Sequence, residues 1–275
     1  MEKTTNIKGK KILVTGSTDG IGKQTASELA QMGGYILVHG KNEKKVTMTV
    51  DYIKKSCSHD NIYGYIADFS RLSEVRKLSE IIHSNHDKLD VLINNAGVFI
   101  NQRTVTEDGY EATFAINHLA PFHLTNLLLD LLQKASPSRI VNVSSVAHHR
   151  ANPDLLNLMT EKDYDGYSAY ALSKLANILF TYELAERLKG ENITANCLHP
   201  GVISTKLLKE GFGITGESIS EGADTSVYLA SSPDVDNITG KYFIKRKITP
   251  SSPATYDTSI RKYLWSMSEK LVGLK

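Results

Sequence analysis

The stretch that decides the fold is Lys11-Ile-Leu-Val-Thr-Gly-Ser-Thr-Asp-Gly-Ile-Gly22, an apolar run that leads directly into a glycine-rich turn. A helical pattern follows over 21–32. Glycines at such a turn let the backbone bend tightly and let a pyrophosphate approach the N–H groups at the helix N-terminus. Taken alone, the turn also fits a plain tight connection. Its place between a first strand and a first helix favours a dinucleotide-binding site.

The turn supplies most of the candidate cofactor contacts, and Ser17 and Thr18 add hydroxyl donors. The candidates are Gly16, Ser17, Thr18, Gly20, Ile21 and Gly22. A site that prefers NAD usually carries an acidic residue about 20 positions further on. Here that place reads Val38-His-Gly-Lys-Asn42 and holds no carboxylate. Lys41 can pair with a 2′-phosphate, the alternative being a solvated loop lysine, so NADP(H) is the expected cofactor.

Short apolar runs alternate with longer amphipathic stretches along the chain. The runs have strand length and the Val and Ile content of strands covered on both faces. They span 11–15, 35–39, 62–66, 91–93, 140–143 and 193–198. The helices expected between them span 21–32, 42–56, 71–86, 109–134 and 168–190. This alternation predicts an α/β Rossmann fold, a doubly wound and mostly parallel sheet with helices on both faces, as one domain over 1–275.

Two segments, 147–167 and 201–222, are too long for ordinary connections, and we expect them to cover the substrate. Within the second, Leu207, Leu208, Phe212 and Ile214 are interpreted as the apolar side of a lid. The alternative is an amphipathic helix packed permanently on the core. Near the C-terminus, Trp265 and its neighbours are interpreted as a segment that docks on the domain.

Composition excludes several classes of protein. The chain has 275 residues, of which 41% are hydrophobic and 23% charged, so it is not disordered. Lys and Arg number 32 against 30 Asp and Glu, a net charge of +2 that points to neither nucleic acid nor an anionic membrane as a partner. The basic residues around 241–247 are interpreted as a solvated sheet edge. No run approaches the roughly 18–20 apolar residues of a membrane span.

Cysteine and histidine usage add two expectations. Cys57 and Cys197 are the only cysteines and form no C-x-x-C pair, which favours a reducing compartment. The polar stretch 1–10 lacks the apolar core of a signal peptide, so we expect a cytoplasmic protein. The pairs His83-x-x-His86 and His148-His149 lack further ligands, and no metal site is expected.

A second motif carries the chemistry. Tyr170 and Lys174 lie four residues apart in a predicted helix and therefore on the same face. A phenol has a pKa near 10. A lysine ammonium at about 4 Å would lower it by about 3 units at an effective dielectric near 20, before desolvation opposes the effect. The spacing alone is common on protein surfaces. Beside the glycine turn, it indicates an acid–base catalyst.

Together these motifs resemble the short-chain dehydrogenase/reductase family, from about residue 10 to residue 245. The residues that carry the likeness are Thr15-Gly16, Gly20-Ile-Gly22, Asp68, Asn94-Asn-Ala-Gly97, Asn117, Ser144-Ser145, Tyr170, Lys174 and Pro200-Gly201. A narrower likeness, to the retinol-dehydrogenase-like branch, lies in 117–125, 139–149, 173–180 and 240–243.

The resemblance implies a catalytic set of Asn117, Ser145, Tyr170 and Lys174. Tyr170 would exchange a proton with the substrate oxygen, and Ser145 would hydrogen-bond that oxygen. Lys174 would hold the nicotinamide ribose and lower the tyrosine pKa, and Asn117 would support a proton-supplying water chain. Ser144 is the competing serine, but strand alternation directs it to the opposite face from Ser145.

The remaining cofactor contacts also come from the resemblance. Asn95 and Gly97 would line the cofactor, Asp68 would lie by the adenine, and Ile203 with Thr205 would hold the carboxamide. The expected activity is that of an NADP(H)-dependent alcohol dehydrogenase or carbonyl reductase acting on a small apolar substrate. An idle dinucleotide-binding sensor or scaffold and a ring double-bond reductase are the alternatives. The sequence leaves open whether the protein forms a homo-oligomer.

Overall fold

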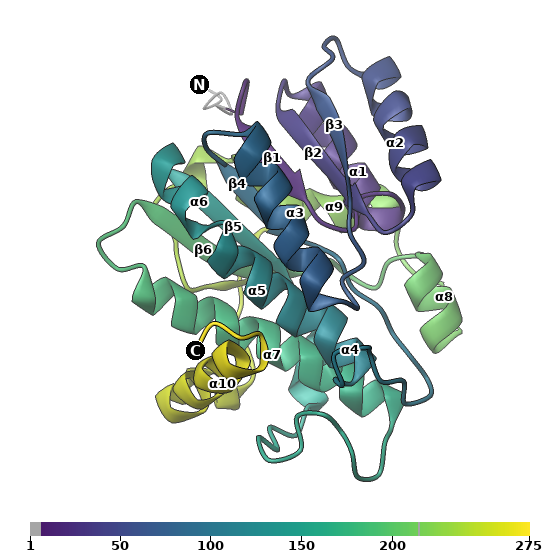
Figure 1. The fold of residues 1–275 in the computed structure, drawn as a ribbon, viewed down its shortest axis with the longest axis vertical. Coiled ribbons are helices and arrows are strands. Elements are labelled where there is room, and N and C mark those ends of the chain that lie inside the picture. The colour runs from purple at the N-terminus through teal and green to yellow at the C-terminus, as the bar shows by residue number, and fades with distance from the viewer. Residues whose placement is uncertain (1–6, 214) are drawn as a thin grey trace.

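A single sheet forms the middle layer of the computed structural model, which describes residues 7–213 and 215–275 (Figure 1). Within these residues the sheet has eight strands in the order β3-β2-β1-β4-β5-β6-β7-β8. Every neighbouring pair is parallel except the last, β7 with β8. The strands are β1 Lys11–Val14, β2 Tyr35–Gly40, β3 Ile62–Ile66, β4 Val91–Asn94, β5 Ser138–Val143, β6 Ile193–His199, β7 Tyr242–Ile244 and β8 Lys247–Ile248.

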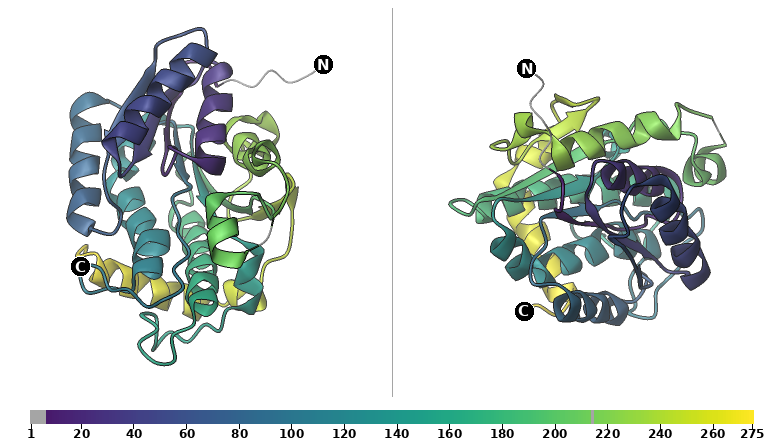
Figure 2. Two further views of the ribbon diagram at one scale, coloured as in Figure 1. Left: turned by 90° about the vertical axis from the view of Figure 1, so that its right-hand side faces the viewer. Right: turned by 90° about the horizontal axis from the view of Figure 1, so that it is seen from above.

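Helices cover both faces of this sheet, as Figure 2 shows from two further directions. One face carries α1 Gly20–Gln31, α2 Glu43–Ser56 and α9 Ile219–Ser231. The other carries α3 Leu72–Asn85, α5 Ala120–Leu127, α6 Leu129–Ala135 and α7 Gly166–Arg187. The predicted doubly wound, mostly parallel α/β fold is confirmed.

Side-chain alternation along the strands explains the two layers. Successive residues of a strand point to opposite faces. Ile12 and Val14 therefore pack with α1 and α2, whereas Leu13 packs on the side of α3 and α7. All three side chains are fully buried. This is why the strands read as continuous apolar runs rather than as alternating ones.

The helix expected over 109–134 is broken into pieces. It consists of α4 Ala112–Phe114, a π-helical turn Ala115–Leu119, α5 and α6. The Glu111 carboxylate accepts hydrogen bonds from the N–H groups of Thr113 and Phe114 and so starts the first piece. Periodicity did not reveal the π-turn, which inserts one extra residue per turn without changing which residue types are apolar.

Beyond residue 200, the described residues form three α-helices for which no bounds were predicted: α8 Lys206–Phe212, α9 and α10 Thr258–Leu271. The expected docking of the Trp265 segment is confirmed. Trp265 on α10 is 5% exposed, and its ring centroid lies 4.9 Å from that of Phe122. The Arg187 guanidinium covers the indole at 4.1 Å. Helix α10 thus closes the outer side of α5 and α7.

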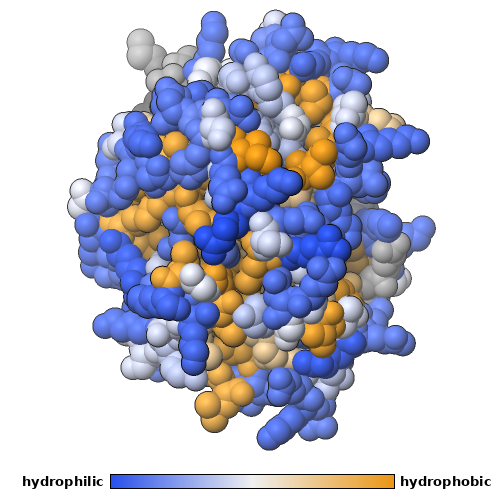
Figure 3. All heavy atoms as spheres, viewed as in Figure 1, coloured by the Kyte–Doolittle hydropathy of each residue, from blue (hydrophilic) through white to orange (hydrophobic). Residues whose placement is uncertain are grey.

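Charged and polar residues cover most of the face in Figure 3, with apolar residues visible between them. At the sheet edge, both residues of β8 are exposed, and Lys245 and Arg246 form the turn before it. No helix among the described residues combines the length and apolarity needed to cross a membrane.

Candidate active site

A cleft of about 650 Å³ opens beyond the carboxyl ends of the central strands. The strand order reverses between β1 and β4, and ligands of doubly wound sheets bind at such a point. The cleft brings together all the predicted site residues except Ser17 and Asn117. They are Gly16, Thr18, Gly20, Ile21, Gly22, Lys41, Asp68, Asn95, Gly97, Ser145, Tyr170, Lys174, Ile203 and Thr205.

The glycine turn forms one end of the cleft. Gly16 and Gly20 have φ values of +62° and +51°, a region that L side chains rarely adopt. A Cβ on Gly22 would lie 2.4 Å from the carbonyl oxygen of Gly16, so no other residue fits there. Asp19 caps α1 by accepting a hydrogen bond from the Gly20 N–H at 2.8 Å. The following N–H groups of the first turn have no intrahelical partners, which suits an anion.

His39 supports the glycine turn from β2, a role that sequence reasoning missed. Its Nδ1 accepts a hydrogen bond from the Gly16 N–H at 3.1 Å, so the proton is on Nε2, which donates to the Ala67 carbonyl at 3.1 Å. Burial lowers the pKa of His39 to about 4 and keeps the ring neutral. The Ser17 hydroxyl is bound to the His39 N–H at 3.0 Å, which explains why it does not line the cleft. The only signal was the position of His39 at the end of β2.

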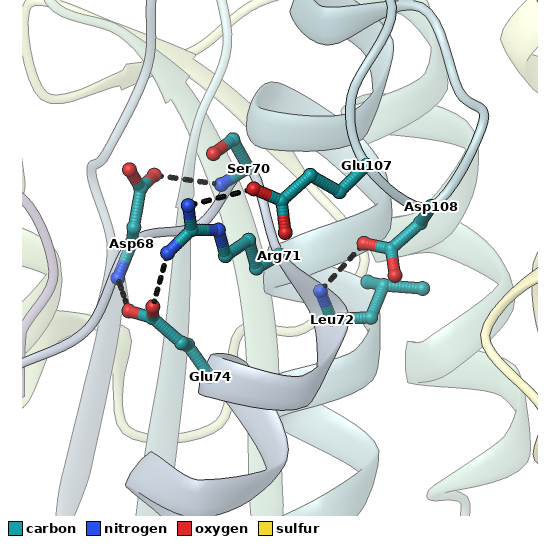
Figure 4. A network of polar contacts seen from close by, with 7 residues as sticks. All are labelled: Asp68, Ser70, Arg71, Leu72, Glu74, Glu107 and Asp108. Atoms are coloured by element: carbon teal, nitrogen blue, oxygen red, sulfur yellow. Dashed lines mark hydrogen bonds and ion pairs between the residues drawn. The ribbon is translucent and has the colours of Figure 1, made fainter.

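Lys41 and Asp68 lie at the same end of the cleft. Burial alone would raise the pKa of Asp68, but hydrogen bonds from Ser70 and the charges of Lys41 and Arg71 outweigh burial and lower it. Figure 4 shows how Arg71 continues this network to Glu74 and Glu107. Asp68 is therefore ionised near neutral pH, and Lys41 remains exposed at the rim.

Ser145 and Tyr170 meet in the middle of the cleft. Ser145 follows β5, and its Oγ accepts a hydrogen bond from the Ala147 N–H at 3.2 Å, which begins a 3₁₀ turn, Val146–Arg150. Tyr170 comes from the first half of α7, whose N-terminus is capped by Asp165. Burial raises the pKa of Tyr170 to about 12, and a hydrogen bond with Ser145 acts in the opposite direction. The expected lowering of this pKa by Lys174 is therefore wrong, because desolvation of the buried phenol sets the direction of the shift.

Lys174 is buried directly behind this pair. Its Nζ lies 5.4 Å from the centroid of the Tyr170 ring and donates a hydrogen bond to the Val143 carbonyl at 3.3 Å. Burial lowers the pKa of Lys174 to about 8. A Cβ on Gly97 would come within 3.3 Å of Nζ, so the glycine leaves room for the ammonium group.

Asn117 lies beneath the cleft, in the π-helical turn. Its Oδ1 accepts from the Val98 N–H at 2.8 Å, and its Nδ2 donates to the Val98 carbonyl and to Ser173 Oγ. It therefore holds the segment after β4 in place. Ser144 Oγ donates to the Lys174 carbonyl at 2.7 Å, so this serine supports α7 while Ser145 faces Tyr170.

The opposite end of the cleft is mostly apolar. Ala147, Tyr167 and Leu207 pack around Tyr170, and Leu208 lines the same end. Leu207 and Leu208 are half-buried on α8. The Phe212 side chain and Ile214, both assigned to the apolar side of a lid, lie outside the described residues. Sequence reasoning did not single out Tyr167 or Arg150, which also line this end.

Backbone pairing closes the base of the segment that carries α8. The Ser204 N–H donates to the Glu217 carbonyl at 3.0 Å, and the Glu217 N–H donates to the Val202 carbonyl at 2.7 Å. Thr205 caps α8 by accepting from the Leu208 N–H.

Within 7–213 and 215–275 no group of three or more His, Cys, Asp or Glu residues is placed to hold a metal ion.

Fold and site together define a Rossmann-type dinucleotide-binding domain with a Ser–Tyr–Lys constellation beside the glycine turn. A family model described as short chain dehydrogenase matches residues 10–212. The chain belongs to the short chain dehydrogenase family, as its sequence motifs indicated, and is an oxidoreductase of that family.

Two curated relatives place it further. Human retinol dehydrogenase 13 is 39% identical, and the match covers 98% of this chain and 86% of the relative. Human polyprenol dehydrogenase is 37% identical over 95% of this chain and 84% of the relative. The predicted likeness to the retinol-dehydrogenase-like branch is confirmed.

Solved structures agree with the fold. A protein from Mycobacterium paratuberculosis superposes with a TM-score of 0.83 at 30% identity, covering 98% of this chain and 96% of the other. A short chain dehydrogenase from Shigella flexneri, solved in complex with NADP, has a TM-score of 0.72 at 25% identity. That match covers 89% of this chain and all of the other.

Proposed function

We propose that this protein is an NADP(H)-dependent oxidoreductase that interconverts an apolar alcohol and its aldehyde or ketone, with Tyr170 as acid and base. The observation that carries the proposal is the meeting of Ser145, Tyr170 and Lys174 in the cleft that also holds the glycine turn. Two relatives are named for retinol and polyprenol, which are both apolar alcohols.

The residues at the glycine end fit a dinucleotide with a 2′-phosphate. Positive-φ glycines and the free N–H groups of α1 suit a pyrophosphate. Lys41 offers an ammonium at the rim, where an NAD-preferring site would carry a carboxylate. When bound, NADP(H) supplies or accepts the hydride at the reacting carbon. Lys174 and Gly97 would border the nicotinamide ribose, and Ile203 with Thr205 its carboxamide.

Proton transfer falls to Tyr170. Its hydroxyl keeps its proton at neutral pH, as carbonyl reduction requires, because burial raises its pKa. During reduction Tyr170 gives this proton to the substrate oxygen, and during oxidation it takes the proton back. Ser145 Oγ accepts from the Ala147 N–H and shares a hydrogen bond with Tyr170. With substrate bound between the two, the Ser145 O–H would donate to the oxygen on which negative charge develops.

Lys174 stabilises the phenolate that forms when Tyr170 has given up its proton. The ammonium lies beside the ring in a dry environment, where its charge acts more strongly than in water. Asn117 holds the backbone at Val98 and thereby positions Gly97 against Lys174. In this proposal Asn117 is a positioning residue and does not touch the substrate.

The test combines a substrate screen with one substitution. Purified protein should oxidise NADPH when given apolar aldehydes or ketones, and Tyr170→Phe should lower kcat by about 10²–10⁴-fold. Cofactor affinity should persist because the glycine turn and Lys174 are untouched. Tyr263→Phe, an exposed tyrosine on α10, is the matched control. Near-normal turnover by Tyr170→Phe would exclude the acid–base role.

A further inference from the structure

Arg150 lines the cleft but has no role in the proposed reaction. It is the last residue of the 3₁₀ turn that Ser145 begins, and it lines the apolar end beside Tyr170. Its guanidinium carbon lies 6.0 Å from the centroid of the Tyr167 ring. The side chain is exposed, and the aromatic face attracts the cation weakly toward the wall of the cleft.

No carboxylate among the described residues neutralises the charge of Arg150. Among the residues that the structure describes, its guanidinium forms no ion pair or hydrogen bond with another side chain. Three other arginines are paired with carboxylates: Arg71 with Glu107, Arg139 with Asp236, and Arg246 with Asp224. Arg150, which lines the cleft, leaves the donors of its planar fork available to a ligand.

The charges that line the cleft are distributed unequally between its two ends. The carboxylates among the described lining residues, Asp19 and Asp68, both lie at the glycine end. The other end carries Arg150 among apolar side chains such as Leu207. An anion at that end is attracted by Arg150, and no carboxylate among the described lining residues there repels it.

We propose that Arg150 binds a carboxylate of the substrate, which makes the preferred substrates oxo acids or hydroxy acids with an apolar chain. The inference rests on the proposed function and narrows its substrate class. A guanidinium binds a carboxylate through two parallel hydrogen bonds, a geometry that lysine does not offer. Arg150 lies beside Tyr167, one helical turn from Tyr170, so the carboxylate and the reacting carbon belong to different parts of the substrate. The apolar wall around Ala147 and Leu207 takes up the chain between them.

The kinetic test compares a carboxylic acid with its own methyl ester. The substrates are 12-oxododecanoic acid, which carries a carboxylate at one end and an aldehyde at the other, and its methyl ester. The two compounds share the chain and the reacting group. Wild type should favour the acid in kcat/KM by about 10- to 100-fold, the value of a charge-assisted pair. Arg150→Gln should abolish this preference through KM, and Arg150→Lys should restore part of it.

Matched controls separate recognition from other roles. Arg76→Gln makes the same change on an exposed arginine of α3 outside the cleft, and it should keep the preference. The KM for NADPH should be unchanged in Arg150→Gln. Equal losses with acid and ester, a raised KM for NADPH, or no preference in wild type would each overturn the assignment.

A binding measurement makes the result independent of turnover. Isothermal titration with dodecanoate in the presence of NADP⁺ should show affinity at least about tenfold weaker for Arg150→Gln than for wild type. Methyl dodecanoate should not distinguish the two proteins. Binding that depends on Arg150 without reduction of any carbonyl would support the assignment and refute the proposed function. Carbonyl reduction without such binding would do the reverse.

Discussion

At the scale of single residues, the lysines and the histidine at the cleft differ in burial, and burial determines their pKa values. Lys41 is exposed and contributes by charge alone, whereas Lys174 and His39 are buried and their pKa values are shifted downward. A neutral His39 is required, since a doubly protonated ring cannot accept the Gly16 N–H. Protonation of His39 would therefore break the hydrogen bond that supports the glycine turn.

Lys41 should set the choice of cofactor. Lys41→Asp removes a charge-assisted contact with the 2′-phosphate, worth about 1.5–3 kcal/mol, and adds repulsion. We expect NADPH to be preferred by wild type and NADH by the variant. The ratio of kcat/KM for the two cofactors measures the change. Equal use of both cofactors by wild type would contradict the role, and Lys45→Asp on α2 serves as the control.

Lys174 should lower stability while it supports catalysis. Its pKa falls from 10.5 in the unfolded chain to about 8 in the fold, so between these values the unfolded state binds more protons. Stability therefore rises with pH from about 8 to 10.5, by up to about 3 kcal/mol. Lys174→Met should be inactive and more stable than wild type at pH 7. Urea unfolding at pH 7 and pH 10 should show this advantage shrinking, and a constant difference would refute it.

At the scale of elements, α8 and α10 differ in position: α8 borders the cleft, whereas α10 packs against the core. Leu207 on α8 packs near Tyr170 but is only half-buried. Trp265 on α10 is almost fully buried among Phe122 and Phe180, on the far side of α7. The same kind of truncation should therefore affect substrate binding in one case and folding in the other.

Leu207→Ala should mainly change substrate KM. The leucine buries apolar surface against the substrate only when the cleft is filled, so its loss weakens long-chain carbonyls more than short ones. The melting temperature should change little. Calorimetry and a chain-length series of aldehydes measure the two effects. A sharp fall in melting temperature with an unchanged substrate profile would place Leu207 in the core.

Trp265→Ala should mainly change stability. Removing a buried indole costs about 3–5 kcal/mol and should lower the melting temperature by several degrees. Residual folded protein should keep its kcat/KM, because α10 does not line the cleft. Thermal unfolding followed by circular dichroism measures the loss, with the exposed Tyr263→Ala on the same helix as control. An equal effect of the two substitutions would refute the docking role.

At the scale of the whole molecule, buried neutral histidines predict sensitivity to acid. Burial lowers the pKa values of His39, His118, His123, His148 and His199 to about 4. Between pH 6.5 and 4 the unfolded chain binds more protons than the fold, so stability is lost as pH falls through this window. For the fully buried ring of His118 the loss approaches about 3 kcal/mol.

Urea unfolding at pH 7, 5.5 and 4.5 measures this dependence. Stability should fall most steeply below pH 6.5, and His118→Gln should reduce the slope by one proton's share. His149→Gln, which alters an exposed histidine, is the control. Stability independent of pH over this range would contradict the assignment of neutral buried rings.

The layered fold and most of the cleft lining could be predicted from the amino-acid sequence alone. Apolar runs such as 11–15 and 193–198 can only be satisfied in a sheet covered on both faces, and the glycine turn after the run 11–15 has one topological place. Tyr170 and Lys174 were predictable as a pair because four residues make one helical turn. These inferences depend on neighbours along the chain.

The neighbours of each group in space depend on tertiary packing, which the sequence pattern does not show. Ser17 faces β2 rather than the cleft, Asn117 lies beneath it, and His39 supports the turn, because strands far apart in sequence are adjacent in the sheet. The pKa of Tyr170 follows from the same cause. The proximity of Lys174 was visible in the sequence, whereas the desolvation that raises the pKa depends on the packing of distant segments around the phenol.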